Sequence, residues 1–485
     1  MERLGIGHVF GLPGAHILPV YDRLYGSQIK SVLVKHEQGA AFMACGYARA
    51  GNRIAACITT AGPGATNLVT GIANAFVEKL PLLVVTGETS TYIFGKGGLQ
   101  ESSGEGGAID QSTLFGGITR YHRIVERTDY LAQVLKQAAK ILLSDNPGPV
   151  LLSFPYNVQK EMVDASLLDG IRFAPDAQPV CNRFAATADM AAMVLAAQHP
   201  VIVAGHGCFL AGAHDLLQAL STEQQIPVAT TLKAKGLVDE DSPLALGCLG
   251  ITSDGKAYRH IVEHADLLIF LGAGFNERTS YLWDARLLGG KRVIQVDIDG
   301  EQLEKAFAAD LAIHGDIRAV LKDLLLHIDD RRRAAAATPI ARAEAALPPP
   351  HFAAISCFLD RLVARFPEGT QIFDDNIILA QTYLKASARH RYFPNTGISA
   401  LGHAIPAALG ARCAVAAPTV AILGDGGFQM CCMELMTAVN YRIPLNVVMI
   451  NNGTLGLIRK NQFQLYHERY IDCDFVNPDY ALLAR

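Results

Sequence analysis

Short runs of β-branched and other apolar residues alternate along this chain with longer alanine-rich segments. The clearest runs are Ile54–Thr60, Pro81–Thr86, Pro149–Phe154, Pro200–Ala204, Asp266–Gly272, Arg292–Asp297, Gln371–Asp374, Thr419–Leu423 and Leu445–Ile450. Runs of this kind are typical of strands buried on both faces, and the segments between them suit crossover helices. The pattern therefore predicts α/β units with parallel sheets. A chain of 485 residues is too long for one hydrophobic core.

Two shifts in composition predict where the domains end. The segment Asp164–Asn182 is mixed and carries two prolines, and Asp329–Pro350 begins with five charged residues, becomes alanine-rich and ends in three prolines. Consecutive prolines cannot be helical and fit an exposed linker. We therefore predict three doubly wound α/β domains with parallel sheets, at about residues 1–165, 180–330 and 350–485.

Charge and composition exclude several classes of function. The 42 Lys and Arg nearly balance the 46 Asp and Glu, for a net charge of −4, so nothing points to nucleic acid or to an anionic membrane surface. No apolar stretch approaches the roughly 18 residues of a membrane span, and no signal peptide is visible. Ten cysteines without a CxxC spacing fit a reducing compartment. A cytoplasmic enzyme is expected.

A glycine-rich turn and an asparagine pair form the strongest functional signal. Within Val420–Asn452, a predicted strand runs into Gly424-Asp425-Gly426-Gly427, a predicted helix follows, and a second strand ends in Asn451-Asn452. Ligands of open α/β sheets bind at such carboxyl ends of neighbouring strands. The glycines let backbone N–H groups approach a diphosphate, and Asp425 and Asn452 offer the oxygen ligands that Mg²⁺ prefers. The alternative is a glycine-rich turn with an unrelated asparagine pair.

A second signal lies closer to the N-terminus. Ser31–Ala50 has the sequence SVLVKHEQGAAFMACGYARA, in which a predicted strand meets Glu37 at the start of a predicted helix. Thr59–Asn67 has the sequence TTAGPGATN, a predicted strand–turn–helix that includes Pro63 and Asn67. A glutamate at a helix start is often only a favourable charge at the helix dipole, so Glu37 also has a structural interpretation.

Together these motifs resemble the thiamine diphosphate-dependent enzymes, and in particular their acetolactate synthase-like branch. The resemblance covers essentially the whole chain and implies a pyrimidine-binding domain, a central nucleotide-fold domain and a diphosphate-binding domain that looks short at its C-terminal end. It implies that thiamine diphosphate binds through Mg²⁺, with Asp425, Asn452 and the backbone carbonyl of Thr454 as metal ligands. The other residues that it places at the cofactor are Pro63, Asn67, Asn376, Leu401, Gly424, Gly426 and Gly427.

The resemblance also gives Glu37 a chemical role. A buried carboxyl that shares a proton with the pyrimidine ring of the cofactor favours the imino tautomer of that ring. The exocyclic nitrogen can then take the proton from the thiazolium carbon, which is the general acid–base step that starts the chemistry. Glu37 is therefore expected to be catalytic.

Three further residues are candidates for catalysis. Gln100 belongs to a Gln-Glu pair that resembles one near the active site of acetolactate synthases, and Gln111 competes for its role. His16, in GLPGAHIL, resembles a proton-shuttling histidine of benzaldehyde lyase, although a lone histidine is more often structural. Asn461 stands where true acetolactate synthases carry the tryptophan that selects the acceptor.

The implied reaction is carboligation. A 2-oxo acid such as pyruvate loses CO₂, and the resulting enamine attacks a carbonyl acceptor. A 2-oxo acid decarboxylase, a 2-hydroxy-ketone lyase of the benzoin type and a catalytically silent truncated paralogue are the alternatives. FAD in the central domain is left open. By resemblance, Glu37 and Asp425 are expected to meet only across the interface of a homodimer or homotetramer.

Overall fold

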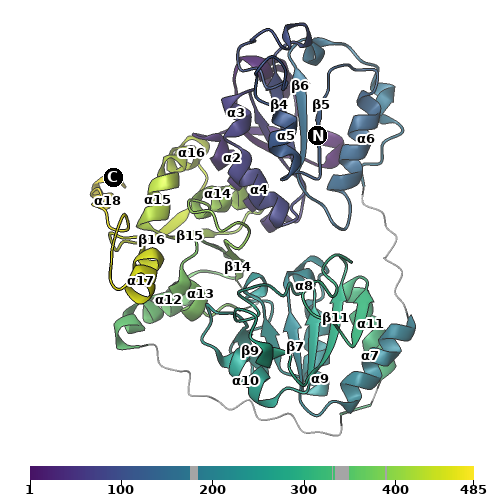
Figure 1. Cartoon of the computed structure of the whole chain (residues 1–485), viewed down its shortest axis with the longest axis vertical. Coiled ribbons are helices and arrows are strands. Elements are labelled where there is room, and N and C mark those ends of the chain that lie inside the picture. Colours follow the sequence, from purple (N-terminus) through teal and green to yellow (C-terminus); the bar gives the residue numbers. More distant parts are fainter. Residues whose placement is uncertain (175–183, 330, 334–348, 388–389, 485) are drawn as a thin grey trace. The chain divides into compact units, whose positions relative to one another are not determined.

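The computed structural model describes residues 1–174, 184–329, 331–333, 349–387 and 390–484 (Figure 1). These residues form two compact units. One comprises Met1–Pro175, Gln371–Ile377 and Asn395–Arg485, and the other comprises Asp176–Thr370 and Ile378–Pro394. The predicted domain boundaries at residues 165, 180, 330 and 350 stay predictions, since one of the two units contains both the N-terminal and the C-terminal part of the chain.

The N-terminal sheet has six strands in the order β2-β1-β3-β4-β6-β5. Its central strands β3 and β4 are buried along their whole length, which is why their sequences are apolar without alternation. The strands are β1 His8–Leu12, β2 Lys30–Leu33, β3 Ala55–Thr59, β4 Leu82–Glu88, β5 Tyr121–Ile124 and β6 Val150–Pro155. The helices are α1 Leu18–Tyr25, α2 Glu37–Gly51, α3 Pro63–Thr66, α4 Val69–Val77, α5 Gln111–Gly116 and α6 Leu131–Leu142.

The central sheet also has six strands, in the order β12-β11-β10-β7-β8-β9. Successive residues of β10 alternate between two hydrophobic clusters, with Ile269 in one and Phe270 in the other, so both faces of the sheet are covered. The strands are β7 Pro200–Ala204, β8 Val228–Thr230, β9 Ala245–Cys248, β10 Leu267–Leu271, β11 Arg292–Asp297 and β12 Leu311–His314. The helices are α7 Phe184–Ala196, α8 His206–Leu210, α9 His214–Gln224, α10 Lys256–His264 and α11 Ile317–Ile328.

The C-terminal sheet has four strands in the order β14-β13-β15-β16. They are β13 Gln371–Asp374, β14 Arg391–Pro394, β15 Thr419–Gly424 and β16 Asn446–Ile450. The helices are α12 Ala353–Arg365, α13 Ile378–Tyr383, α14 Ala404–Ala414, α15 Asp425–Cys431, α16 Leu435–Tyr441, α17 Gly456–Leu465 and α18 Tyr480–Leu483. The predicted α/β class with three parallel sheets is confirmed. None of the helices in the described part of the chain has the length and hydropathy needed to cross a membrane.

The N- and C-terminal sheets belong to one unit because α2 packs directly on α14 (Figure 1). Glycines make this approach possible. A Cβ atom on Gly46 would lie 1.9 Å from the backbone oxygen of Ala407, and one on Gly410 would lie 1.8 Å from that of Met43. Helices that touch through their backbones in this way hold a fixed relative position.

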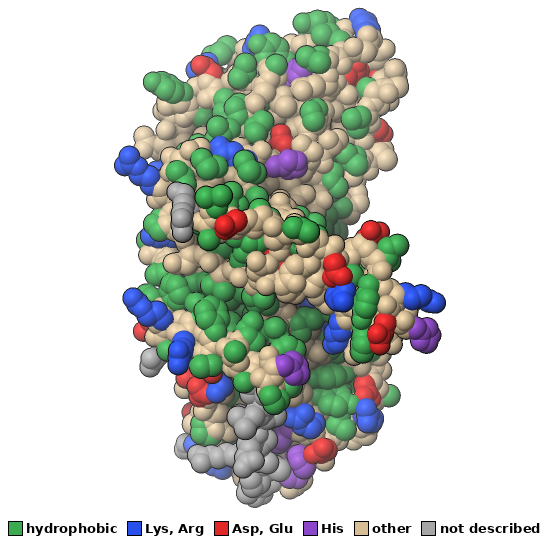
Figure 2. Space-filling view, turned by 90° about the vertical axis from the view of Figure 1, so that its left-hand side faces the viewer, with side chains coloured by type: hydrophobic (Ala, Val, Ile, Leu, Met, Phe, Trp, Pro, Cys, Tyr) green, Lys and Arg blue, Asp and Glu red, His purple; other side chains and the backbone are tan. Residues whose placement is uncertain are grey.

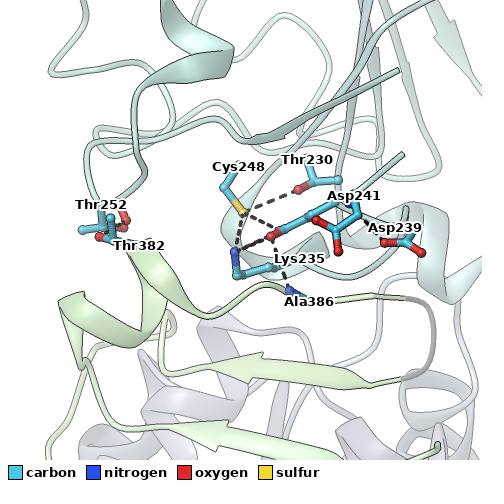
Figure 3. A network of polar contacts seen from close by, with 9 residues as sticks. Thr230, Lys235, Asp239, Asp241, Cys248, Thr252, Thr382 and Ala386 are labelled. Atoms are coloured by element: carbon cyan, nitrogen blue, oxygen red, sulfur yellow. Dashed lines mark hydrogen bonds and ion pairs between the residues drawn. The ribbon is translucent and has the colours of Figure 1, made fainter. Parts of the chain in front are cut away.

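A buried ion pair stabilises the other unit. The Lys235 ammonium lies 2.9 Å and 3.1 Å from the two carboxylate oxygens of Glu240, and the Lys235 side chain is only 4% exposed. Burial lowers the pKa of Lys235, but Cys248 and Glu240 outweigh that effect, so the net shift is upward. Glu240 also accepts a hydrogen bond from the backbone N–H of Ala386 at 3.3 Å. Figure 3 shows Lys235 between Cys248 and Ala386. Glu240 therefore connects the 378–394 segment to the central sheet.

We predict that Lys235→Met lowers the free energy of unfolding by about 3–5 kcal/mol, because it leaves the Glu240 charge buried without its partner. Lys385→Met is the matched control, since Lys385 pairs with Asp241 at 3.6 Å with both side chains largely exposed. Loss of such a pair costs about 0–1 kcal/mol. Urea unfolding of the two variants checks this, and equal losses would contradict it.

Candidate active site

Parallel pairing of β15 with β16 brings two sequence motifs to one edge of the C-terminal sheet. Gly424, the last residue of β15, lies opposite Ile450, the last residue of β16. Asp425 follows as the first residue of α15, and Asn452 follows β16 by two positions. The strand–turn–helix–strand order expected from the sequence is thus the observed one.

Three oxygen-bearing groups converge at this edge. One end of the Asn452 side-chain amide lies 3.2 Å from Asp425 Oδ1 and 2.9 Å from the backbone oxygen of Thr454. If that end is the nitrogen, it donates to both oxygens. If that end is instead the oxygen, the oxygens of Asp425, Asn452 and Thr454 face one another, and a cation between them would offset their repulsion. A carboxylate, an amide oxygen and a backbone carbonyl form a donor set that suits Mg²⁺. The residues therefore fit a magnesium ion.

The carboxylate of Asp425 is almost fully buried and is held by N–H groups. Its Oδ1 accepts from the backbone N–H of Gly426 at 3.0 Å, and its Oδ2 accepts from Gly453 at 2.6 Å. The Asn477 amide also donates to Oδ2 at 2.7 Å and is itself bound by Gln429 and Tyr480. Sequence reasoning missed Asn477. The only signal was a polar NPD segment in the C-terminal tail.

Close packing explains the glycines after Asp425. A Cβ atom on Gly426 would lie 2.7 Å from the Leu455 side chain, and one on Gly427 would lie 2.5 Å from Asp375 Oδ2. Burial raises the pKa of the Asp375 carboxyl to about 6, against the lowering effect of N–H donors such as that of Gly402. The segment after β13 thus lies beside the glycine-rich turn.

The remaining candidates of this domain lie near the same turn. Asn376 has a left-handed backbone with φ of 61°, donates to the backbone oxygen of Ser399 at 3.1 Å, and has a buried Oδ1 without a partner. Leu401 is half-buried and immediately precedes Gly402, whose N–H is bound to Asp375 at 2.8 Å. The backbone N–H of Thr454 faces Asn452 Oδ1 at 3.3 Å, and its hydroxyl donates to the backbone oxygen of Cys473 at 2.8 Å.

In the N-terminal domain, Glu37 is the first residue of α2 and is buried. Its Oε2 accepts a hydrogen bond from the Asn67 amide at 2.9 Å. Two candidates separated by thirty positions are thus in contact, and Asn67 orients the Glu37 carboxyl. Pro63 begins α3 and is exposed. His36 caps α2 by accepting from the N–H of Gln38 at 3.1 Å.

Glu434, a residue that sequence reasoning missed, links this helix start to the C-terminal domain. Its Oε1 accepts from the backbone N–H groups of Lys35 at 3.0 Å and His36 at 3.1 Å. A Cβ atom on Gly39 would lie 2.3 Å from the same oxygen. Burial raises the pKa of the Glu434 carboxyl. The residues just before Glu37 are therefore fixed by a side chain that follows α15.

The remaining catalytic candidates lie in two different places. His16 Nδ1 lies 3.1 Å from Gln100 Oε1, and the Thr60 hydroxyl donates to the same oxygen at 3.3 Å. Gln111 is instead buried, and its amide donates to the Thr86 hydroxyl at 3.2 Å. The structure thus brings His16 together with Gln100 and not with Gln111. Sequence reasoning missed Gln159, whose amide supports the His16 backbone oxygen at 2.7 Å.

Comparison with known protein families assigns three segments of the chain. Residues 1–111 match the thiamine pyrophosphate enzyme N-terminal TPP binding domain, residues 187–324 the central domain, and residues 376–485 the C-terminal TPP binding domain. The candidate residues at both sheet edges fall inside the first and third matches.

Known proteins with similar sequences include several acetolactate synthases. The acetolactate synthase of Arthrospira platensis is 32% identical over 508 residues, which cover 100% of this chain and 86% of that protein. The acetolactate synthase large subunit of Porphyra purpurea is 33% identical, and the aligned region covers 96% of this chain and 81% of that protein. The acetolactate synthase isozyme 2 large subunit of Escherichia coli K12 is 32% identical, and the aligned region covers 99% of this chain and 86% of that protein.

We predict that Glu434→Ala lowers the free energy of unfolding by about 1–3 kcal/mol, because two partly buried backbone N–H groups lose their acceptor. Glu126→Ala, in the same unit, is the control, since Glu126 is exposed and its loss should be nearly neutral. Chemical unfolding of both variants checks this. A Glu434→Ala protein as stable as Glu126→Ala would show that the contact between the two domains contributes little.

Proposed function

Because the chain belongs to the thiamine pyrophosphate enzymes, in their acetolactate synthase-like branch, we propose that it decarboxylates a 2-oxo acid such as pyruvate and transfers the remaining acyl unit to a carbonyl acceptor. The observation that carries this proposal is the convergence of Asp425, Asn452 and the Thr454 carbonyl at the ends of β15 and β16. A carboxylate, an amide and a backbone carbonyl that meet at the carboxyl ends of two parallel strands are placed where ligands of open α/β sheets bind.

The same residues define how the cofactor would be held. Asp425, Asn452 and Thr454 would bind Mg²⁺, and the backbone of Gly424, Gly426 and Gly427 would face the diphosphate. When bound, thiamine diphosphate supplies the carbon that stabilises the negative charge left by decarboxylation. Asn67 fixes one oxygen of Glu37, so the other oxygen is available to share a proton with the pyrimidine ring.

His16 and Gln100 favour a second candidate function. Their contact places an imidazole, a side chain often used for proton transfer, beside an amide that orients it. A 2-hydroxy-ketone lyase would use such a pair to move the proton of a carbinol. Incubation with thiamine diphosphate, Mg²⁺ and pyruvate separates the reactions by their products, which are acetolactate or acetoin for carboligation and acetaldehyde for decarboxylation. No product from pyruvate would leave the 2-hydroxy-ketone lyase and the catalytically silent paralogue, and incubation with a 2-hydroxy ketone such as benzoin separates these two by whether it is cleaved.

Two finer points belong to the proposal. The visible absorbance of the purified protein tests whether the central domain binds FAD. A cytoplasmic location is supported by the cysteines, since each one that the structure describes is a free thiol, which is usual in a reducing compartment.

We propose further that the chain works as a dimer. The side of the molecule on which α15 and α17 lie exposes many hydrophobic side chains (Figure 2). Met430, Met433, Met436 and Val439 follow one another at intervals of three residues from α15 to α16, and they are 46% to 66% exposed. An apolar face of this kind is typical of a surface that a partner covers.

The position of Glu37 supports the same conclusion. Asp425 starts α15, whereas Glu434, which holds the residues before Glu37, lies nine positions later in a helical segment that changes from α-helix to 3-10 helix after Cys431. Glu37 and Asp425 of one chain are thus held toward opposite ends of this helical segment. Pairing of Glu37 with Asp425 from a second copy would complete a cofactor site, and a two-fold dimer would contain two such sites.

We predict that Asp425→Ala and Asn452→Ala each abolish magnesium-dependent binding of thiamine diphosphate, because each removes an oxygen ligand. Calorimetric titration with and without Mg²⁺ measures this. Asn461→Ala is the control, since Asn461 is exposed and lies outside the proposed metal site. Normal binding by either ligand variant would show that the metal lies elsewhere.

We also predict that two inactive variants restore each other. In a mixture of Glu37→Gln and Asp425→Ala chains refolded or co-expressed together, about a quarter of the wild-type activity should return, because half of the dimers are mixed and each of these has one intact site. The double variant Glu37→Gln/Asp425→Ala, mixed with either single variant, is the control and should stay inactive. Absence of recovery in a mixture that demonstrably forms mixed dimers would rule out a shared site.

A further inference from the structure

One buried carboxyl near the candidate active site has no part in the proposed chemistry. Glu88 is the last residue of β4 and is fully shielded from solvent, with 0% exposure. Its Oε1 accepts two backbone hydrogen bonds, from Thr89 at 2.7 Å and from Ser102 at 3.0 Å. Its Oε2 is buried without a hydrogen-bond partner. A fully satisfied structural carboxylate would use both oxygens, so this group is held in an unusual state.

Ser102 connects Glu88 to the active-site loop. The Ser102 hydroxyl accepts from the backbone N–H of Gly62 at 3.3 Å and lies 3.2 Å from the backbone oxygen of Gln100. A Cβ atom on Gly62 would lie 2.9 Å from that of Gln100, so the two backbones are in direct contact. Gln100 in turn meets His16 and Thr60. A continuous set of contacts thus leads from Glu88 through Ser102 to Gln100.

The segment that carries Gln100 needs such a support. Gln100 has a φ of 58°, a left-handed conformation that costs a non-glycine residue about 1 kcal/mol or more. The segment has no regular secondary structure between η3 (Thr91–Ile93) and α5, and several of its glycines also have positive φ. Without the bond from Ser102 to Glu88, the strained backbone at Gln100 would be free to relax.

We propose that Glu88 is a positioning residue that keeps Gln100 in the active site while its carboxyl is neutral and releases the loop when the carboxyl becomes charged. Gln100 is taken as an active-site residue from the proposed function. The neutral carboxyl still offers Oε1 to both N–H groups. The charged form places a full negative charge in a site without water, with Oε2 unpaired, and opening of the loop would relieve this by hydration.

The electrostatic surroundings of Glu88 set the pH at which this happens. Burial raises its pKa to about 7, the N–H groups of Thr89 and Ser102 lower it, and the nearby Glu101 carboxylate raises it. Glu101 is itself bound to Gly95, Gly98 and Ser103 of the same loop. The titratable residues of the neighbouring segments are His16, which packs against Gly87 and contacts Gln100, and Tyr156, whose backbone N–H binds the Glu88 backbone oxygen; both are partly buried. Charged residues farther along these segments are exposed to solvent; they are Lys96, Glu105, Asp110 and Lys160.

The sign of the pH effect follows from linkage. The carboxyl has a raised pKa when the loop is closed and a value near the ordinary one when the loop is open and hydrated. The closed state therefore binds the proton more tightly, and loop closure is lost as the pH rises through about 7. Between the ordinary carboxyl pKa and about 7, the equilibrium constant for opening should rise by up to about tenfold per pH unit; at higher pH it should stay constant, because the carboxyl is then charged in both states.

Hydrogen–deuterium exchange of the purified protein, without cofactor or substrate, tests this. Peptides that cover residues 98–104 should lose protection as the pH rises from 5 to 7.5 and change little at higher pH, after correction for the intrinsic exchange rate. In Glu88→Gln, which mimics the neutral carboxyl, the protection of the same peptides should be independent of pH and higher than in the wild type at pH 8.5. Glu105→Gln, an exposed change on the same loop, should behave like the wild type.

Protection of residues 98–104 that does not change with pH in the wild type would overturn the proposal, and this measurement does not need the variant to fold. An equal loss of protection in Glu88→Gln and the wild type would also overturn it. Because the exchange is measured without cofactor, the result stands even if the thiamine diphosphate titration fails. In a turnover assay, the wild type should lose activity as the pH rises toward 7, and Glu88→Gln should lack this loss while its affinity for the cofactor is unchanged.

Discussion

The contact between α2 and α14 determines how the two halves of the candidate site are presented. The helices approach so closely that neither Gly46 nor Gly410 has room for a side chain. Glu37 begins α2, and the turn before α14 carries Gly402, which binds Asp375 beside the glycine-rich turn. One backbone contact therefore fixes both Glu37 and the surroundings of the glycine-rich turn at Asp425, and any change in the helix spacing would move both.

Buried carboxyls are a recurring element of this unit, and N–H groups hold each of them. Asp425 accepts hydrogen bonds from the loop after β16 and from Asn477. Glu434 accepts them from the start of α2, and Glu88 accepts one from the loop that carries Gln100. Each carboxyl thus joins segments that are distant in sequence. N–H donors without a full charge offset only part of the free-energy cost of burying a carboxylate, which is why the pKa values of Glu88 and Glu434 are raised.

The arrangement of the strands shows how far sequence patterns extend. Strands buried on both faces, such as β3, β4 and β10, coincide with apolar runs, because a parallel strand covered by helices has no polar face. Edge strands such as β5 and β12 are only partly buried and were not among the runs. Their sequences contain polar residues because one side of each faces solvent.

The sequence by itself determined the parallel α/β class and the meeting of Asp425 with Asn452. Both follow from local order, since consecutive parallel strands end at the same edge of a sheet. Only the tertiary structure distinguished Gln100 from Gln111, found Asn67 at Glu37, and brought Asn477, Glu434 and Glu88 into the argument. These residues act through hydrogen bonds between segments far apart in the chain. Such contacts leave no periodic or local signal, because they depend on how whole elements pack rather than on the residues beside them.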